Sequence, residues 1–368
     1  MRGAALALLA AAASLLAVSA RDAPRKKLIE WGWDEPDTAF LRANVKEMEQ
    51  SPFDGCVYHV IAETAGGPVN VTWRAWSGRA FQDEELARAA NDLRQTPFVR
   101  FRSNFLRMNV TPGNLDWYDD HQPVLANARL LARLSRIGRG AGIALDTEQY
   151  EGKLFDYARQ RDSARRSFAD YSAQARRRGR ELMEAFEDGH PGLVVLLSFG
   201  HSYVELVNTT YNRVSATNPY GLLAPFADGL VEGARNAIVV DGYEPAYWFK
   251  QPGQFTAAYQ RMRDGSLALV ADPERYRQHV SFGFGLWMDY DWRTHGWSDT
   301  DLAKNYFQPH ELYAATRAAL QTADEFVWIY SEQPRWWSAA GRVKLPSAYD
   351  DALRRAKRDA GGRARRPR

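Results

Sequence analysis

Eight short apolar runs, each followed by a longer stretch of helical character, recur along the 368 residues of this chain. The runs end in polar and aromatic residues and occupy positions 28–33, 55–60, 98–102, 142–146, 193–199, 237–241, 280–287 and 326–330. Helical periodicity and capping residues mark the segments 37–51, 83–95, 120–138, 162–189 and 309–322 between them. Strands that alternate with helices in this way form a parallel sheet.

Eight such units in one chain favour a closed (β/α)8 barrel, the TIM barrel of the α/β class, over an open doubly wound sheet. The chain length fits one barrel domain, and no low-complexity linker divides it. No Gly-rich dinucleotide fingerprint follows the first run, and the sequence contains no phosphate-binding P-loop. We therefore predict a single-domain barrel that works without a cofactor.

The two ends of the chain differ in composition from the rest. Residues 1–20 combine a positive charge at Arg2, an Ala- and Leu-rich run and the small-residue site Val18-Ser19-Ala20, which is typical of an export signal. No later stretch of about 18 apolar residues predicts a membrane span. We expect a signal peptide at 1–20, the catalytic barrel at 21–353, and a secreted or periplasmic protein.

Residues 354–368 form a basic tail that we expect to be disordered. The part beyond about residue 361 offers charge but almost no apolar surface, so its removal should leave the thermal stability unchanged. The formal net charge of +3 resides largely in this tail, and no nucleic-acid recognition motif accompanies it. We therefore expect no nucleic-acid partner.

Active sites of this fold lie where the strands end and the following loops begin. The predicted strand ends carry acids and aromatic rings, and the chain contains 12 Trp and 17 Tyr in all. Aromatic rings stack on the apolar faces of sugars, and carboxyl groups protonate a leaving oxygen and stabilise an oxocarbenium-like transition state. The pattern predicts a carbohydrate substrate. The expected substrate-binding residues are Trp31, Trp33, Tyr58, His59, Arg102, His201, Asp241, Tyr243, Trp287, Trp328 and Glu332.

The sharpest local signal is an apolar strand that ends in Asp146-Thr147-Glu148. Side chains alternate with period two along an extended chain, so Asp146 and Glu148 should point in the same direction. Two carboxyl groups so close raise the pKa of one of them, which creates the protonated acid that glycoside hydrolysis needs near neutral pH. The alternative is an Asp that caps the next helix beside an exposed Glu.

This segment resembles the fourth-strand signature of chitinase-like glycoside hydrolases, in which an Asp-x-Glu follows an apolar strand. The resemblance implies that Glu148 is the proton donor and Asp146 its partner. Ala141 and Ala144 stand where that family carries two further acids. With the barrel pattern, the signature indicates the broad superfamily of (β/α)8-barrel glycoside hydrolases.

A second carboxyl group must face the first across the substrate. Glu244 and Asp241 follow the sixth run and Asp289 follows the seventh, so these three acids compete for that role. A separation of about 5 Å between the two carboxyl groups indicates retention of configuration, and roughly 6.5 to 9.5 Å indicates inversion. The expected catalytic residues are Glu148, Asp146, Glu244 and Asp289.

Other chemistries find less support in the sequence. The histidines are dispersed, so we expect no metal. A Gly-x-Ser-x-Gly elbow is absent, and Cys56 lies in an apolar run. The main rival is an extracellular barrel that binds glycans without cleaving them. That alternative would be favoured if no two of the nominated acids shared one pocket. These acids are Asp146, Glu148, Asp241, Glu244, Asp289 and Glu332.

Overall fold

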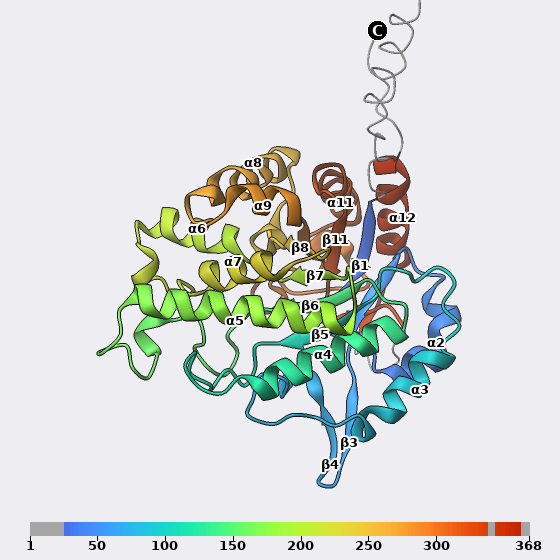
Figure 1. Ribbon diagram of the computed structural model, residues 1–368. Helices are drawn as coiled ribbons and strands as arrows, with labels where there is room; N and C mark the ends of the chain where they lie inside the picture. The colour runs from blue at the N-terminus through green and yellow to red at the C-terminus, as the bar shows by residue number, and fades with distance from the viewer. Residues whose placement is uncertain (1–25, 338–342, 362–368) are drawn as a thin grey trace, which may run out of the picture.

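The central sheet consists of parallel strands, as a computed structural model shows for residues 26–337 and 343–361, the part of the chain that it describes (Figure 1). The strands are β1 (Lys27–Glu30), β2 (Gly55–Tyr58), β5 (Phe105–Asn109), β6 (Gly142–Asp146), β7 (Val194–Leu197), β8 (Ile238–Asp241), β9 (Val280–Phe282), β10 (Phe284–Trp287) and β11 (Phe326–Tyr330). Their spatial order is β10-β11-β1-β2-β5-β6-β7-β8-β9. Each is a short apolar run that is buried on both faces, as parallel strands generally are.

Strands β9 and β10 are two halves of one barrel strand, separated only by Gly283. β9 pairs with β8 and β10 pairs with β11, so the run 280–287 closes the sheet on itself. The backbone N–H of Gly283 continues the ladder by donating to the Asp241 carbonyl at 3.2 Å. The result is a single-domain (β/α)8 barrel, which confirms the predicted fold class.

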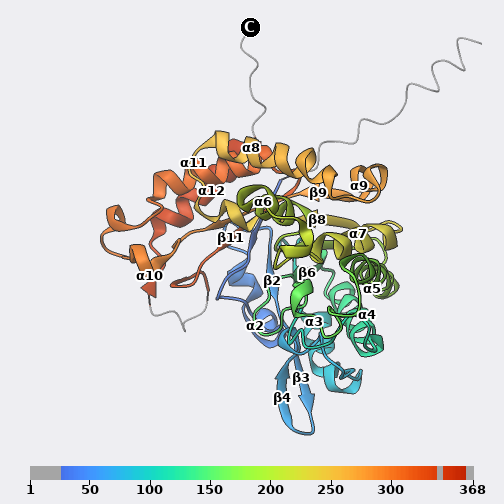
Figure 2. The ribbon, with the colours of Figure 1, turned by 90° about the vertical axis from the view of Figure 1, so that its left-hand side faces the viewer.

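Helices surround the strands on the outside of the barrel (Figure 2). They are α2 (Thr38–Met48), α3 (Ala87–Gln95), α4 (Gln122–Ile137), α5 (Phe168–Gly189), α6 (His201–Tyr211), α7 (Leu223–Gly233), α8 (Pro252–Arg263), α9 (Pro273–His279), α10 (Trp292–His295), α11 (Pro309–Thr322) and α12 (Ser347–Gly361). The hairpin β3 (Ile61–Thr64) and β4 (Gly67–Asn70) projects from the loop after β2 (Figure 1). A small pair, β12 (Pro334–Arg335) and β13 (Val343–Lys344), follows β11.

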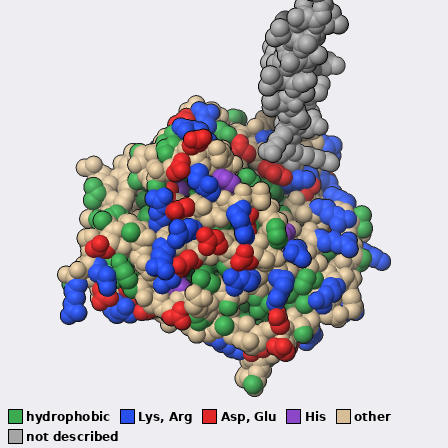
Figure 3. All heavy atoms as spheres, in the orientation of Figure 1, with side chains coloured by type: hydrophobic (Ala, Val, Ile, Leu, Met, Phe, Trp, Pro, Cys, Tyr) green, Lys and Arg blue, Asp and Glu red, His purple; other side chains and the backbone are tan. Residues whose placement is uncertain are grey.

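Local sequence signals explain where the helices begin. Asp37 caps α2 by accepting from the Phe40 N–H at 2.7 Å, as the predicted start at residue 37 requires. The helix predicted from residue 162 starts later, because Ser167 and Asp170 form a capping box at the start of α5. Lys and Arg alternate with acids on the face formed by α4 and α5 (Figure 3). Within α5, the exposed Arg177 pairs with the partly buried Glu181 at 2.9 Å.

The third strand differs from the prediction. The strand lies at Phe105–Asn109, whereas the predicted run 98–102 forms the loop before it. The carboxylate of Glu49 accepts the backbone N–H groups of Val99, Arg100 and Phe101 at 2.7 to 3.0 Å, which ties up the donors that a strand would use in its ladder. This shift places Arg107, rather than Arg102, in the barrel.

Two hydrophobic clusters hold the barrel together. One fills its interior and includes Ile29, Val57, Phe105 and Trp328, and the larger one packs between the sheet and the helices. Because side chains alternate along a strand, neighbours such as Val57 and Tyr58 fall into different clusters. This alternation decides which strand residues can reach the open end of the barrel.

Helix α12 extends the ordered chain beyond the predicted domain boundary at residue 353. Leu353 and Ala356 are buried on its inner face, and the guanidinium of Arg354 pairs with Asp350. The helix runs to Gly361, so the first residues of the expected disordered tail are helical. Residues 362–368 and the expected signal peptide at 1–20 lie outside the described residues. Within those residues no helix is long and apolar enough to cross a membrane.

Gly142 starts the strand that leads to Asp146, and a side chain has no room there. A Cβ built on Gly142 would lie 1.8 Å from the backbone carbonyl oxygen of its β7 partner, Val194. We expect Gly142→Ala to lower the free energy of unfolding by about 1–3 kcal/mol or more, measured by denaturant titration. Gly253→Ala is the control, because its Cβ would meet nothing within 4 Å in α8 and should leave stability equal or slightly higher. Equal stability of both variants would contradict this account.

Candidate active site

A cavity of about 800 Å³ opens where the barrel strands end, within the range of small-molecule sites. The loops after β1, β2, β6, β8 and β11 contribute to its wall, together with β5, the last residue of β10 and the β3–β4 hairpin. The lining residues are Trp31, Gly32, Trp33, Glu35, His59, Asn70, Trp73, Arg107, Asp146, Glu148, Tyr150, Glu244, Tyr247, Trp287, Tyr330, Glu332 and Arg335.

The cavity brings together eight of the residues nominated from the sequence. They are Trp31, Trp33, His59, Asp146, Glu148, Glu244, Trp287 and Glu332. Four of these are acids, so the condition that would have favoured a non-catalytic barrel is not met.

Three nominated aromatic residues lie away from the cavity, because their strand positions face other layers. Tyr58 and Tyr243 are buried in the cluster between sheet and helices, and Trp328 is buried inside the barrel beneath the cavity floor, 5.6 Å from the Trp31 ring. Arg102 is also misplaced, since it belongs to the loop before β5 and donates to the Val99 carbonyl at 3.2 Å. These four residues do not line the site.

His201 and Asp241 serve the start of α6 instead of the cavity. Asp241 is buried and accepts the backbone N–H groups of Gly200 and Ser202 at 2.9 and 3.0 Å, and burial raises its pKa. The Nε2 atom of His201 lies 3.0 Å from the carboxylate of Asp228 on α7. Both nominated residues therefore have structural partners outside the cavity.

Asp289 is buried behind the cavity wall. Its carboxylate accepts the backbone N–H groups of Glu332 and Gln333 and the indole N–H of Trp287 at 2.9 Å. Burial raises the pKa of Asp289 to about 6. This acid ties the loop after β10 to the loop after β11 and does not reach the cavity. Of the three acids expected to compete for the second role, Glu244 is the one that lines the cavity.

Asp146 is held by four hydrogen bonds at the end of β6. Its Oδ2 accepts from the guanidinium of Arg107 at 2.6 Å and from the Tyr150 hydroxyl at 3.0 Å. Its Oδ1 accepts from the Glu148 N–H at 3.1 Å and the Ser198 hydroxyl at 3.2 Å. These four contacts fix the turn that presents Glu148.

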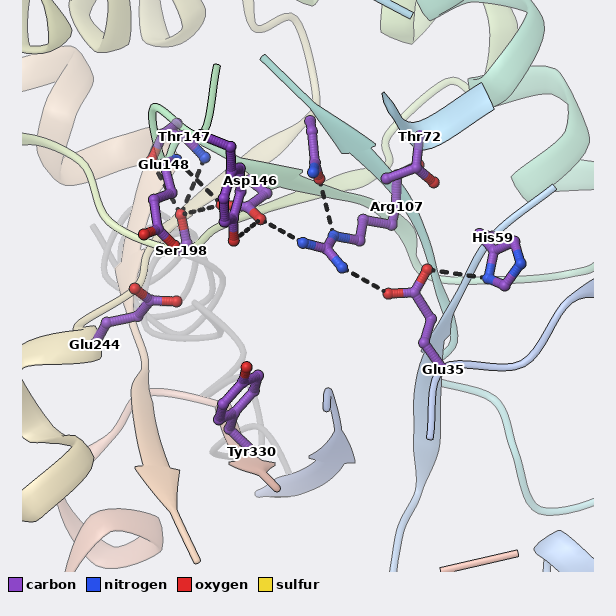
Figure 4. A network of polar contacts seen from close by, with 12 residues as sticks. Glu35, His59, Thr72, Arg107, Asp146, Thr147, Glu148, Ser198, Glu244 and Tyr330 are labelled. Carbon is purple, nitrogen blue, oxygen red and sulfur yellow. Dashed lines mark hydrogen bonds and ion pairs between the residues drawn. The ribbon is translucent and has the colours of Figure 1, made fainter. Parts of the chain in front are cut away.

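Glu148 and Glu244 direct their carboxyl groups toward one another across the cavity (Figure 4). Burial, followed by the charge of Asp146, raises the pKa of Glu148. Burial also raises the pKa of Glu244 to about 8, and the charges of Asp146 and Glu148 add to that shift. The Oε1 atom of Glu244 accepts a hydrogen bond from Tyr247 at 2.8 Å, on the short 3₁₀ helix Glu244–Trp248.

A buried ion-pair network supports this end of the barrel. Arg107 lies between two carboxylates, with Glu35 at 2.9 Å and Asp146 at 2.6 Å, and His59 lies 3.2 Å from Glu35 (Figure 4). Burial would raise the pKa of Glu35, but Arg107 and His59 outweigh it and lower that pKa. The network therefore keeps Glu35 ionised and fixes the position of Asp146.

Sequence reasoning missed several cavity residues. Arg107 was missed because the third strand was predicted at the wrong position. Glu35 lies two residues after the first run, so the strand-end rule could have included it. Asn70 ends the hairpin inserted after β2, and Trp73 ends the short 3₁₀ helix Val71–Trp73 that follows it; the strand-end rule covers neither segment. Tyr247 lies one helical turn after Glu244, a spacing that could have indicated it.

Aromatic rings form two walls of the cavity. Trp73 and Tyr150 contact each other edge to face with ring centroids 5.1 Å apart. Tyr247 and Tyr330 stack at 5.5 Å, and Trp287 lies edge-on to both of them. Such faces suit sugar rings, with carboxyl groups between them. In the described part of the chain, no group of three or more His, Cys, Asp or Glu side chains is arranged to hold a metal ion.

Comparison with known proteins supports the fold. No protein-family model matches the sequence, and no curated protein sequence matches it. The solved structure of GH5_18 from Streptomyces cattleya in complex with GlcNAc has a TM-score of 0.51 and 12% identity, and the match covers 94% of this chain and 83% of that one. It shows that the chain has the barrel architecture of a solved glycoside hydrolase.

Two further solved structures are more distant. A GH5-4 broad specificity endoglucanase from Clostridium longisporum has a TM-score of 0.48 and 11% identity, with 88% of this chain and 86% of that one covered. A psychrophilic family 10 endo-beta-1,4-xylanase has a TM-score of 0.44 and 10% identity, with 90% and 96% covered.

Proposed function

We propose that this protein is a secreted glycoside hydrolase in which Glu148 and Glu244 are the two catalytic carboxyl groups. The observation that carries the proposal is that these acids, from the fourth and sixth barrel strands, line one cavity walled by aromatic rings. Carboxyl groups on either side of a bound sugar are what both retaining and inverting hydrolysis require. Asp146 acts as a positioning residue that holds the turn of Glu148.

Glu244 is the better candidate for the proton donor. Its Oε1 is occupied by the Tyr247 hydroxyl, which leaves Oε2 to carry the proton toward a leaving oxygen. A pKa of about 8 keeps that proton in place near neutral pH. Glu148 then acts as the ionised group that attacks the sugar or activates water. The sequence favoured the reverse assignment, with the proton on Glu148, and kinetics can distinguish the two.

The proposal is tested by incubating the purified protein with a panel of polysaccharides and measuring the release of reducing ends. We expect release from at least one polysaccharide, and none above background from the Glu148→Gln/Glu244→Gln double variant. Binding to a polysaccharide without any release would instead favour the glycan-binding barrel.

The same assignment predicts how activity and stability depend on pH. Glu244 must be protonated to act as the acid, so kcat/KM should fall as the pH rises above about 8.

The raised pKa of Glu244 also means that, between about pH 4.5 and 8, the folded state holds a proton that the unfolded chain has lost. Stability should therefore fall as the pH rises from about 4.5 to about 8, and Glu244→Gln should remove that part of the decline. Melting curves across this range check the sign, and equal slopes for both proteins would contradict it.

A further inference from the structure

Of the two arginines that line the cavity, Arg107 and Arg335, only Arg335 forms no ion pair among the described residues. Arg107 is engaged by two carboxylates, and Glu332 is held by Arg293 at 2.7 Å. The guanidinium of Arg335 lines the cavity, and its buried Nη1 atom has no hydrogen-bond partner in the described part of the chain. A buried guanidinium N–H without a partner is destabilising, so a bound ligand that accepts from it would gain affinity.

The indole of Trp33 lies beside this guanidinium and remains open to solvent. The guanidinium carbon of Arg335 is 5.7 Å from the Trp33 ring centroid, and 52% of Trp33 is exposed. Arg293 lies at a similar distance of 5.8 Å on the same ring, but its charge is neutralised by Glu332. Trp33 and Arg335 thus join an exposed aromatic ring to a guanidinium that forms no ion pair among the described residues. The nearby Glu30 carboxyl is attracted to Arg335, but burial raises the pKa of Glu30 well above its usual value and so favours its uncharged form.

The strand order places this pair across the barrel from Glu148. Trp33 follows β1 and Arg335 follows β11, whereas Glu148 follows β6. Three barrel strands separate β11 from β6 in either direction around the sheet, since β9 and β10 count as one. A sugar on Trp33 would therefore lie beside the sugar that is cleaved, in a neighbouring subsite.

We propose that Trp33 and Arg335 form a subsite for a sugar that carries a carboxylate or a sulfate ester, an inference that rests on the proposed function. A guanidinium binds such an oxyanion with two parallel hydrogen bonds, and the indole stacks on the sugar ring. The carboxyl groups of the cavity differ in how strongly they would repel a bound anion. Glu332 is paired with Arg293, and Glu35 and Asp146 share Arg107. Glu148 follows β6 on the opposite side of the barrel, and burial raises the pKa of Glu244 to about 8.

The experiment measures binding by calorimetry with the full-length Glu148→Gln protein and three probes: a trigalacturonate, a sulfated galactan oligosaccharide and a neutral galactan oligosaccharide. We expect one charged probe to bind at least about 10-fold more tightly than the neutral probe. Arg335→Met should lower that affinity by about 10- to 100-fold, the usual worth of charge-assisted hydrogen bonds, and Arg335→Lys by less. Binding of the neutral probe should change little.

Arg79→Met is the matched control, because Arg79 also lies over an aromatic ring, that of Phe81 at 4.6 Å, but outside the cavity. Its removal subtracts the same charge and should leave all three affinities unchanged. An equal loss in both arginine variants, or equal affinity for charged and neutral probes, would overturn the subsite. A preference for the carboxylated or the sulfated probe identifies which oxyanion it accepts. Melting curves of each variant verify folding.

This outcome is separable from that of the proposed function, since binding is measured without turnover. Charge-selective binding that depends on Arg335, in a protein that hydrolyses no glycan, would support the subsite and overturn the hydrolase. Hydrolysis of neutral glycans, with no effect of Arg335→Met on the binding of the charged probes, would support the hydrolase and overturn the subsite.

Discussion

Glu244→Gln should lower turnover on a natural glycan by about two to four orders of magnitude, the usual worth of general acid catalysis. The amide keeps the shape of the side chain and its contact with Tyr247 but cannot donate a proton with the acidity of a carboxyl group. The dissociation constant of the substrate should change little. An aryl glycoside with a good leaving group needs little protonation, so the same variant should lose much less activity on it.

Glu148→Gln should behave differently, because it removes the group that attacks the sugar or activates water. We expect large losses on both kinds of substrate. If instead Glu148→Gln spared the activated substrate and Glu244→Gln did not, the acid would be Glu148, as the sequence suggested. Asp289→Asn is the control, since this buried acid does not line the cavity. Any loss of activity in it should follow a loss of stability and show no dependence on the leaving group.

Arg107→Met should lower the free energy of unfolding by about 3–5 kcal/mol. Arg107 is largely buried between Glu35 and Asp146, so its removal leaves two buried carboxylates without their cation. Chemical denaturation measures the loss. Arg177→Met removes an exposed arginine from its pair with Glu181 and should leave the stability unchanged.

A double variant separates the ionic contribution of Arg107 from the packing of its side chain. Glu35→Gln in the Arg107→Met background removes one of the two uncompensated charges, so the double variant should be more stable than Arg107→Met alone. If the stability losses of Arg107→Met and Glu35→Gln simply added in the double variant, the two residues would not be coupled through their charges. Activity should fall in Arg107→Met even at temperatures where it is folded, because Asp146 loses the contact that orients the turn of Glu148.

The fold was predictable because each barrel strand is a short apolar run whose two faces are both buried. Seven of the eight runs overlap the observed strands. The third failed because Phe98 and Phe101 look like strand residues, whereas their segment is held as a loop by the Glu49 carboxylate. A contact from a residue 50 to 52 positions earlier in the chain cannot be read from local pattern.

The candidate site was predictable where it depended on strand ends and less so where it depended on side-chain direction. Asp146 and Glu148 line one cavity, as period-two alternation implies. Tyr58 and Trp328 were nominated by position but face the outer and inner cores of the barrel. Arg335 comes from the extension after β11, for which the strand-end rule gives no direction.

The most direct test of the account is azide rescue of Glu148→Ala with an activated aryl glycoside. Removing the side chain opens space beside the anomeric carbon, and azide can attack there while Glu244 still serves as the acid. We predict that added azide restores aryl release and that mass spectrometry detects a glycosyl azide. A variant that binds the aryl glycoside, shows no azide-dependent rate and forms no glycosyl azide would contradict the central claim that Glu148 and Glu244 face one another across the substrate.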